Sequence, residues 1–524
     1  MKQEVALRLT PEQASQEEFF KNIAARKMKL SPGKITGLRV VRRSIDARQS
    51  QVMVQVHLEV WTGEPMPAHE PVSFHWPNVV NASEVVIVGA GPGGLFAALK
   101  LIELGFKPIV IERGKEVSER KKDLALLNRN EQLNEDSNYA FGEGGAGTFS
   151  DGKLYTRSKK RGNFRNFLEI LHFHGASDDV LIDAHPHIGT DRLPRVIRNI
   201  RETIIAAGGE FLFNSRVVDF LLQGDEIVGV EIADGTKITG KAVILATGHS
   251  ARDIYWLLNE KGIELEAKTW AMGVRVEHPQ DLIDQIQYHS PEGRGNYLPA
   301  ASYSFSHQVG ERGVYSFCMC PGGFIVPAMT SADEMVVNGM SPSGRNSPFA
   351  NSGMVVEIRP EDIPEYHQYG AMAGLKYQQD VERLCAVNGG QGVIAPAQRL
   401  VDFVGKRLSY DLPECSYVPG TVSAPLHFIL PEHISTRLQE GFKFFGKRAH
   451  GYLDGDAIVL GAESRTSSPV RIPRDKDTFQ HISIKRLFPC GEGAGYAGGI
   501  ASSAIDGERC AEAVARQLKD LSPS

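Results

Sequence analysis

The stretch SEVVIVGAGPGGLFAALKLIELGFKPIVIER, residues 83–113, decides the fold of this chain. Val85–Val88 form an apolar run without a polar interruption, which is typical of a parallel strand buried on both faces. The apolar residues that follow recur at helical spacing until Gly105, which predicts a helix that ends there. Pro108–Ile111 predict a second strand. The segment therefore predicts a β-strand, a helix and a second β-strand parallel to the first.

Three glycines of this segment have the G-x-G-x-x-G spacing of a dinucleotide-binding turn. Gly89 permits the tight turn, Gly91 lets a pyrophosphate approach the backbone, and Gly94 lets the helix pack closely on the strand. Glu112 ends the second strand, where a carboxylate can accept the ribose hydroxyls of an adenosine while the helix N-terminus holds the phosphates. The segment therefore predicts a complete dinucleotide-binding βαβ unit.

Two further stretches match the same glycine spacing, and neither has the context that gives it meaning. Gly142, Gly144 and Gly147 follow NEDSNYAF, which is no buried strand. Gly493, Gly495 and Gly498 lie too near the C-terminus for a crossover helix, a second strand and an acid to follow. Only the turn at Gly89 is therefore interpreted as a dinucleotide fingerprint.

Composition narrows the class of protein. The chain has 524 residues, 42% of them hydrophobic, with a net charge of −5, which indicates about three globular domains and argues against a dedicated polyanion binder. No apolar run is long enough to cross a bilayer, and the first residues lack a signal peptide's apolar segment. The six cysteines include no C-x-x-C pair. We expect reduced thiols and a cytoplasmic location.

Three segments in order resemble the FAD segments of the glutathione-reductase-type flavoprotein superfamily. They are GAGPGG at 89–94, VILATG at 243–248 and LFPCGEGAG at 487–495. In that superfamily the acid of the late motif, here Glu492, binds a ribitol hydroxyl. The next helix points its N-terminus at the flavin pyrimidine, and its positive end stabilises the negative charge of a reduced flavin.

Within the superfamily, the chain most resembles a group of largely uncharacterised FAD-dependent dehydrogenases. The resemblance extends over nearly the whole chain and includes RRSIDAR at 42–48, FGEGGAGTFSDGKL at 141–154, HPHIGTD at 185–191 and CMCPGG at 318–323. It implies FAD as the cofactor. One departure from the superfamily follows Glu112, the acid expected to bind the ribose. Many members have a glycine pair after that acid, whereas this chain has ERGKEVSERKKD at 112–123. Arg113 and Arg120 lie in this segment and are expected to contact the cofactor.

The expected fold class is α/β: a Rossmann-type FAD-binding domain with an inserted β-rich substrate domain and a small N-terminal α+β module. Residues 1–62 form the module, 63–82 a proline-rich linker, 83–260 and 481–524 the two parts of the FAD-binding domain, and 261–480 the inserted domain. The expected FAD contacts are Gly89, Ala90, Gly91, Pro92, Gly93, Gly94, Glu112, Arg113, Arg120, Gly145, Ala146, Gly147, Thr148, Val217, Ala246, Thr247, Gly248, Gly491, Glu492, Gly498, Gly499 and Ile500.

We expect a FAD-dependent oxidoreductase that transfers hydride between flavin N5 and an organic substrate, with NAD(P)H as a transient electron donor bound in an open cleft. The disulfide reductases of the superfamily are excluded, because no cysteine precedes Cys318. No residue is predicted as the catalytic acid. His185, His187 and His249 could act as acids near a substrate, but structural or surface roles are the favoured interpretation for all three. Lys153 and Ser150 are candidate residues beside the flavin, where either could stabilise the negative charge of its reduced form. The pair Cys318 and Cys320 is a second candidate for a redox or catalytic role.

The N-terminal module leaves an alternative open. Residues 26–48 hold eight Lys or Arg and one acid, and Arg39, Arg42, Arg43 and Arg48 make a basic group. The alternative function is a flavin-dependent RNA-modifying or RNA-binding protein that uses this module. A third interpretation is that the module docks a protein partner.

Overall fold

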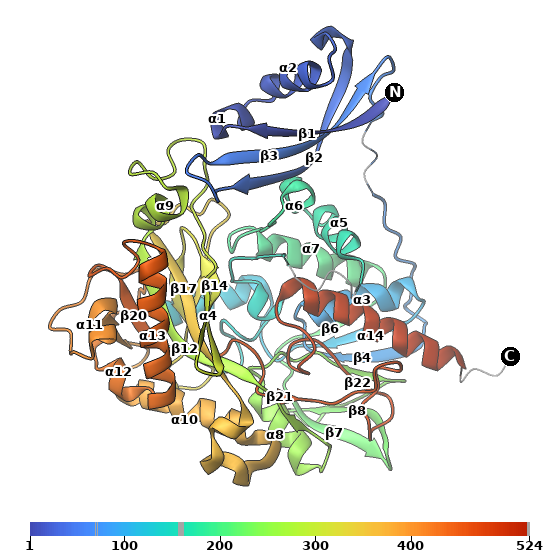
Figure 1. Ribbon diagram of the computed structural model, residues 1–524. Helices are drawn as coiled ribbons and strands as arrows, with labels where there is room; N and C mark the ends of the chain where they lie inside the picture. Colours follow the sequence, from blue (N-terminus) through green and yellow to red (C-terminus); the bar gives the residue numbers. More distant parts are fainter. Residues whose placement is uncertain (69, 71, 156–161, 521–524) are drawn as a thin grey trace.

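The computed structural model describes residues 1–524 except 69, 71, 156–161 and 521–524. Figure 1 shows three parts: the N-terminal module at the top, the nucleotide-binding part at the lower right and the inserted domain on the left. The linker of residues 63–82 runs down one side as an extended segment, without a helix or strand among its described residues. No helix of the described part of the chain is long and apolar enough to span a membrane.

The N-terminal module is a three-stranded antiparallel sheet covered by a helix. The strand order is β1-β3-β2, so that β3 is central. Alternate residues of β3, Val54, Val56, Leu58 and Val60, are buried against Phe20 and Ala24 of α2. The elements are β1 (Lys2–Leu9), α1 (Pro11–Ala14), α2 (Glu17–Lys27), β2 (Ile35–Asp46) and β3 (Met53–Thr62).

The nucleotide-binding part is built on a five-stranded parallel sheet of order β22-β10-β4-β5-β6. The register pairs Val88 with both Ile111 and Leu245, and Leu245 with Pro489, so the loops that follow four strands emerge at one edge. The α/β fold is thereby confirmed. The strands and the crossover helix are β4 (Glu84–Val88), α3 (Pro92–Glu103), β5 (Lys107–Ile111), β6 (Glu210–Leu212), β10 (Val243–Leu245) and β22 (Leu487–Pro489).

Helices cover one face of this sheet and an antiparallel meander covers the other. Phe211 precedes the meander and belongs to β6 of the parallel sheet, because it pairs with Val110 of β5. The helices on the first face, beside α3, are α5 (Phe164–Phe173), α6 (Asp179–Ile182), α7 (Leu193–Ala206) and α14 (Ile500–Asp520). The meander is β7 (Val217–Gln223), β8 (Glu226–Ile232) and β9 (Lys237–Thr239), and α8 (Arg252–Glu260) packs on the same face as the meander. α4 (Val117–Asn128) packs partly against the core of the inserted domain.

The inserted domain has a seven-stranded mixed sheet of order β13-β14-β17-β12-β20-β18-β19. Its strands are β12 (Trp270–Pro279), β13 (Ser306–Val309), β14 (Arg312–Cys320), β17 (Phe349–Ile358), β18 (Ala395–Arg399), β19 (Thr421–Ser423) and β20 (Ile458–Glu463). Two short pairs lie beside it, β15 (Phe324–Pro327) with β16 (Val337–Met340) and β11 (Glu266–Ala267) with β21 (Val470–Arg471).

Substantial helices also belong to this domain, and the prediction of an irregular β-rich segment did not include them. They are α9 (Gln280–Tyr288), α10 (Ala373–Val387), α11 (Leu400–Gly405), α12 (Leu426–Ile429) and α13 (Glu432–Arg448). In α13, Ile434, Leu438, Phe442 and Phe445 lie on one buried face. That i, i+4 pattern is a helical signal in the sequence, but Gly441 and Gly446 and the aromatic residues among them lower the helix propensity.

A buried cluster of four charges ties the inserted domain to the nucleotide-binding part. Arg252 of α8 forms ion pairs with Glu334 and Glu382 at 2.9 and 2.7 Å. Arg465 contacts the same two carboxylates at 2.7 and 3.3 Å. The cations of Arg252 and Arg465 lower the pKa of Glu382 to about 2 although burial alone would raise it. The cluster balances two positive and two negative charges, which fixes the two domains against each other.

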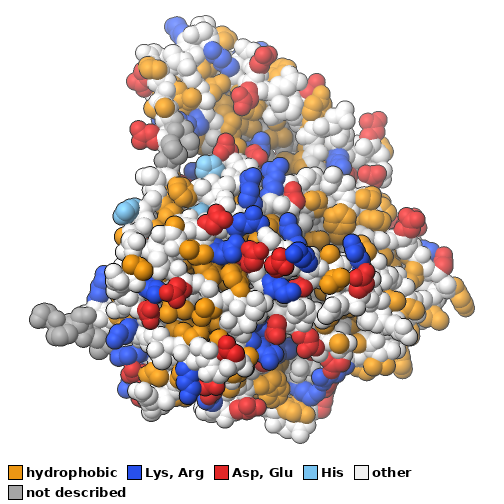
Figure 2. Space-filling model, turned by 180° about the vertical axis from the view of Figure 1, so that it is seen from behind, with side chains coloured by type: hydrophobic (Ala, Val, Ile, Leu, Met, Phe, Trp, Pro, Cys, Tyr) orange, Lys and Arg blue, Asp and Glu red, His pale blue; other side chains and the backbone are white. Residues whose placement is uncertain are grey.

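Much of the basic group on the N-terminal module is paired within the chain. Arg43 contacts Asp179 and Asp183 of the α6 region at 2.9 Å each, which attaches the module to the nucleotide-binding part. Arg48 pairs with Asp46 at 2.7 Å, and Arg39 lies over the ring of Trp61. Figure 2 shows the basic side chains on the module's visible face scattered among acidic and apolar ones. RNA binding through this module stays a prediction.

Candidate cofactor and substrate site

A large cavity, of about 1260 Å³, lies at the edge where the parallel strands end and extends to the inserted domain. Its floor is made by the loops after β4, β5, β10 and β22. Its opposite wall comes from β14, β16 and the loop around Arg345. In open parallel sheets ligands bind outside the carboxyl ends of the strands, as they would here.

The glycine turn after β4 forms one end of the cavity. Gly89 has a φ of 105°, which an L side chain rarely adopts, and a Cβ there would collide with the carbonyl of Ala246. A Cβ on Gly94 would collide with the carbonyl of Gly89, so this glycine serves helix packing and does not line the cavity. Gly91 faces the cavity, and a Cβ there would approach only Gly145, at 3.9 Å. The N-terminus of α3 thus lies open to a phosphate.

Glu112 fastens this turn and keeps one acceptor position free. Its Oε2 accepts the N–H of Ala90 at 3.0 Å, and its Oε1 accepts those of Gly114 and Gly142 at 2.9 and 3.0 Å. A carboxylate has about four acceptor positions, so Oε2 retains one. Because Glu112 lines the cavity, that position can take a ribose hydroxyl. Ala90 serves through its N–H and is not itself part of the lining.

Arg113 lies beside Glu112 and closes the adenosine end of the cavity. It forms ion pairs with Asp136 and Asp253 at 2.7 and 3.0 Å and stacks on the ring of Phe141 at 4.1 Å. Val217 also lines the cavity, as expected. With both carboxylates engaged, the guanidinium offers its plane more than its charge to a ligand, as is suitable for an adenine.

Arg120 does not reach the cavity, which corrects the expectation that it contacts the cofactor. It is fully buried and donates hydrogen bonds to the carbonyls of Asn138, Tyr139, Glu143 and Gly145. Burial lowers its pKa to about 10, with Glu112 and Glu143 opposing that shift. Arg120 therefore holds the loop that carries Gly145–Gly147 against the glycine turn.

Thr148 and Ser150 also act within that loop. Thr148 is buried outside the cavity lining, where its hydroxyl donates to the carbonyl of Glu143. Ser150 lines the cavity and donates to the carbonyl of Gly147 at 2.7 Å. Gly145, Ala146 and Gly147 line the cavity as expected.

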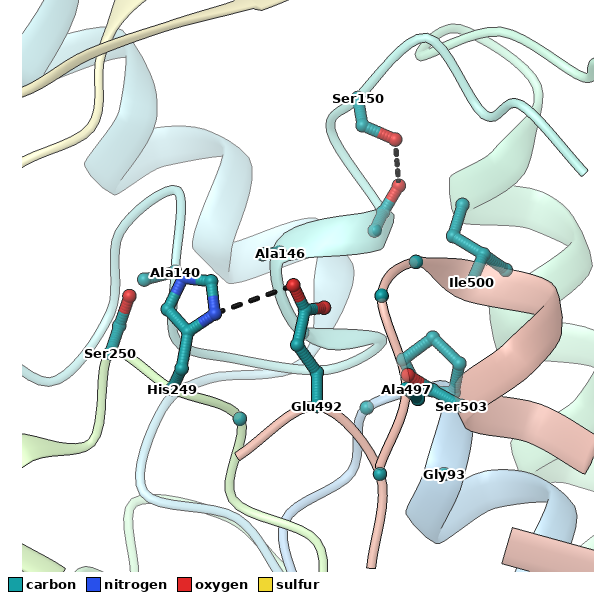
Figure 3. Close-up of a pocket in the computed structure, with 18 of the residues that line it drawn as sticks. Gly93, Ala140, Ala146, Ser150, His249, Ser250, Glu492, Ala497, Ile500 and Ser503 are labelled. Atoms are coloured by element: carbon teal, nitrogen blue, oxygen red, sulfur yellow. Dashed lines mark hydrogen bonds and ion pairs between the residues drawn. The ribbon is translucent and has the colours of Figure 1, made fainter. Parts of the chain in front are cut away.

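The other end of the cavity is the start of α14. The first N–H groups of a helix have no intrahelical partner, and here Ile500–Ser503 lie in the lining. Figure 3 shows Glu492 and His249 pointing toward each other across from Ile500, and His249 Nδ1 lies 3.3 Å from Glu492 Oε1. His249 is therefore a cavity residue, whereas the sequence reading favoured a structural or surface histidine. A Cβ on Gly498, Gly499 or Gly248 would meet no atom within 4 Å.

These features fit FAD. One continuous cavity joins an adenosine site, a helix N-terminus for phosphate and a second helix N-terminus for an electron-rich ring. Gly248, Gly498 and Gly499 leave open space at the ring end, and Gly91 leaves space beside the N-terminus of α3. Gly93, Pro92, Ala246, Thr247 and Gly491 complete the lining between them.

The wall opposite α14 carries the polar groups available to a substrate. Lys153 Nζ lies 4.0 Å from Asp151, and Arg345 donates to the same carboxylate at 2.8 Å. Burial would raise the pKa of Asp151, but the Lys153 and Arg345 cations outweigh it and lower that pKa. Two cations thus share one carboxylate, and the Arg345 Nε is buried without a hydrogen-bond partner among the described residues.

The candidate catalytic residues divide between the wall and the interior. Lys153 and Cys318 line the cavity, whereas Cys320 is fully buried behind it. His185 lines the cavity against Tyr155, and His187 lies outside the lining, hydrogen-bonded to the carbonyl of Ser343. The sequence reading missed the residues that the inserted domain contributes, namely Tyr303, Ser304, Asn338, Arg345 and Arg465.

Comparisons with known proteins agree with this geometry. Residues 83–255 match the family described as pyridine nucleotide-disulphide oxidoreductase, residues 269–466 the FAD-dependent protein, C-terminal domain-like family, and residues 1–61 a domain of unknown function. The chain is 39% identical over 507 residues to an uncharacterised protein of Clostridium beijerinckii, covering 93% of this chain and 94% of that one.

Two more distant likenesses cover less or align less well. A thiamine thiazole synthase of Methanococcus maripaludis is 28% identical over 218 residues, covering 37% of this chain and 69% of that protein. Among solved structures, a geranylgeranyl bacteriochlorophyll reductase-like protein from Thermoplasma acidophilum aligns with a TM-score of 0.35 and 13% identity, covering 84% of this chain and 79% of that one.

Proposed function

This chain belongs, with the Clostridium beijerinckii protein, to a family of FAD-dependent oxidoreductases in the glutathione-reductase-type superfamily, and we propose that it transfers hydride between flavin N5 and a small organic substrate. Its cofactor is FAD. The substrate binds between the flavin and the inserted domain. NAD(P)H acts as a transient electron donor at the same open side of the cavity. The observation that carries the proposal is the cavity itself, which continues past the nucleotide loops to a polar wall from a second domain.

Bound FAD supplies two-electron chemistry at its isoalloxazine ring. The chain's residues position that ring and adjust its surroundings. Glu112 and the N-terminus of α3 would hold the adenosine and pyrophosphate, and Glu492 would hold the ribityl chain. The N-terminus of α14 would stabilise negative charge at the pyrimidine edge.

On the substrate side, Lys153 and Arg345 place two cations at the cavity wall, where both lie beside the carboxylate of Asp151. Positive charge at this wall stabilises an anionic group of the substrate as well as the reduced ring. Tyr303 and Ser304 add hydroxyl groups for orientation. We therefore propose a substrate that carries an anionic or carbonyl group.

The reductive half-reaction tests this proposal. Purified protein is mixed anaerobically with NADH or NADPH, and flavin bleaching is followed near 450 nm with protiated and with C4-deuterated nicotinamide. Hydride transfer predicts bleaching that slows about threefold or more with deuterium, on the order of an ordinary primary isotope effect. Flavin that neither nicotinamide bleaches, or that bleaches without an isotope effect in pre-steady-state traces, would contradict the proposed donor and step.

A matched pair of lysine variants tests the wall. Lys153→Met removes a cavity cation and should slow flavin reduction about 10-fold to 100-fold, since one stabilising group at a developing charge has an effect of about that size or more. Lys122→Met removes a surface cation that pairs with Glu119 and should leave the rate unchanged. Equal rates in both variants would remove Lys153 from the mechanism.

A further inference from the structure

The end of β14 has an irregularity that places one cysteine of CMCPGG at the cavity and the other behind it. Phe317 pairs with Gly353 of β17, but the next pair joins Cys320 to Asn351, so the register shifts between them. Cys318 has a φ of 45°, a conformation uncommon for a side-chain-bearing residue. Such bulges re-aim side chains next to active sites. As a result Cys318 lines the cavity and Cys320 is fully buried.

The two thiols form a unit with unequal acidity. Cys320 Sγ lies 3.3 Å from the carbonyl of Cys318, and the two side chains hydrogen-bond each other. The hydrogen bond from Cys320 lowers the pKa of Cys318 to about 6 against the effect of burial, and the Lys153 and Arg275 cations act in the same direction. The thiolate and burial together raise the pKa of Cys320 well above its usual value. The more acidic thiol of the pair is therefore Cys318, the one that lines the cavity.

We propose that Cys318 and Cys320 are a redox pair that exchanges two electrons with the flavin. In one direction the Sγ–Sγ bond forms, both electrons pass to oxidised FAD, and the proton of Cys320 goes with them, so that the reduced cofactor is FADH⁻. In the other direction FADH⁻ returns two electrons and one proton, the Sγ–Sγ bond breaks, and a Cys318 thiolate and a Cys320 thiol result. Atoms and charge balance without a further reactant.

This pair is distinct from the cysteines expected after the ribose acid in the disulfide reductases, because it belongs to the inserted domain and faces the cavity from the opposite wall. The inference rests on FAD as cofactor but on neither NAD(P)H nor the identity of the organic substrate. It goes beyond hydride transfer by giving the chain a second two-electron carrier. Each chain would then store about four electrons instead of about two.

A second close pair of cysteines is the competitor. Cys490 and Cys510 lie under the late FAD motif, and Arg474 donates to Cys510 Sγ at 3.3 Å. Here the neighbouring thiol and burial raise the pKa of Cys490, which lines the cavity, while Cys510 lies outside the lining. Asp506 lies within the same group and takes an ion pair from Arg474 at 2.6 Å. We interpret this group as structural.

The test is an anaerobic dithionite titration of the FAD-loaded protein, first exposed to air so that any reactive pair is oxidised. The wild type should take up about four electrons per FAD and Cys320→Ser about two. Two controls keep the wild-type value: Cys415→Ser, which removes a thiol outside the cavity, and Cys510→Ser, which breaks the competing pair. Uptake of only about two electrons per FAD by the wild type would overturn the proposal.

A chemical readout that needs no activity accompanies the titration. Unfolded air-oxidised protein is alkylated with a light reagent, reduced, and alkylated again with a heavy one. The heavy label should appear on Cys318 and Cys320 and disappear after prior reduction with dithionite. Heavy label on Cys490 and Cys510 instead, with extra electrons that survive Cys320→Ser and vanish in Cys510→Ser, would assign the chemistry to the other pair. If NAD(P)H reduces the flavin but the wild type takes up only about two electrons per FAD in the titration, the proposed function is intact and this inference is refuted.

Discussion

The substitution Glu112→Gln should weaken FAD binding while leaving a folded protein. The carboxylate accepts three backbone N–H groups at 2.9–3.0 Å and is 5% exposed. An amide oxygen in the Oε1 position keeps the bonds from Gly114 and Gly142, but the amide NH₂ then faces the N–H of Ala90. The same NH₂ group takes the place of Oε2, so the free acceptor position that a ribose hydroxyl would use is lost.

The magnitude follows from the bonds lost. One charge-assisted bond to the ribose contributes about 1.5–3 kcal/mol, and the unpaired N–H of Ala90 costs about 1–3 kcal/mol of stability. The first figure corresponds to a loss of affinity of about 10-fold to 150-fold, since 1.4 kcal/mol is a factor of ten. The second should appear as a lower free energy of unfolding of the apoprotein.

Apoprotein reconstitution measures both effects. FAD is titrated into apoprotein and binding is followed by the change in flavin fluorescence, and urea unfolding of the apoprotein gives stability. Glu84→Gln is the matched control, because Glu84 lies at the opposite end of β4, half exposed and paired with Lys107, and should alter neither quantity. A Glu112→Gln protein that binds FAD as tightly as the wild type would refute the assignment of the adenosine end.

Three further predictions concern the buried cluster of four charges, the ring end of the cavity and the Cys318 thiol. Arg252→Met leaves the two buried carboxylates of the cluster with one cation, so urea unfolding should show a loss of about 3–5 kcal/mol in the free energy of unfolding. Arg48→Met on the surface should show no loss; equal behaviour of the two variants would contradict the role of the cluster. Gly498→Val places a side chain in open cavity space, so the apoprotein should melt as the wild type does but fail to take up FAD; normal FAD content would place the ring elsewhere. Because the folded pKa of Cys318 is about 6, its alkylation rate should rise with pH through that value and level off near neutrality; a midpoint near 8.5 would indicate an ordinary thiol.

The parts of the fold set by local signals were predictable from the sequence. The glycine turn, the apolar strands and Glu112 lie within one short segment, and the structure places them as the parallel sheet, α3 and the cavity floor. The start of α14 followed from the late motif in the same way. In each case the chemistry depends on neighbours in sequence, which a pattern can register.

The substrate wall could not be read from the sequence in this way. Arg345 reaches Asp151 across 194 positions, and Arg252 meets Glu382 across 130, so only the folded chain brings them together. Arg120 illustrates the opposite error: a conspicuous arginine near the ribose acid turned out to hold backbone carbonyls and not the cofactor. The bulge at Cys318 depends on the register against β17, which CMCPGG alone does not specify.

A crystal structure of the FAD-loaded protein tests the central claim most directly, that one cofactor spans from Glu112 to the start of α14. The account predicts a ribose hydroxyl at hydrogen-bond distance, about 2.7–3.2 Å, from Glu112 Oε2 and the flavin pyrimidine oxygen at the same distance from an N–H at the N-terminus of α14. An adenosine located beside α14, or an isoalloxazine ring outside the cavity wall formed by Cys318 and Lys153, would contradict it.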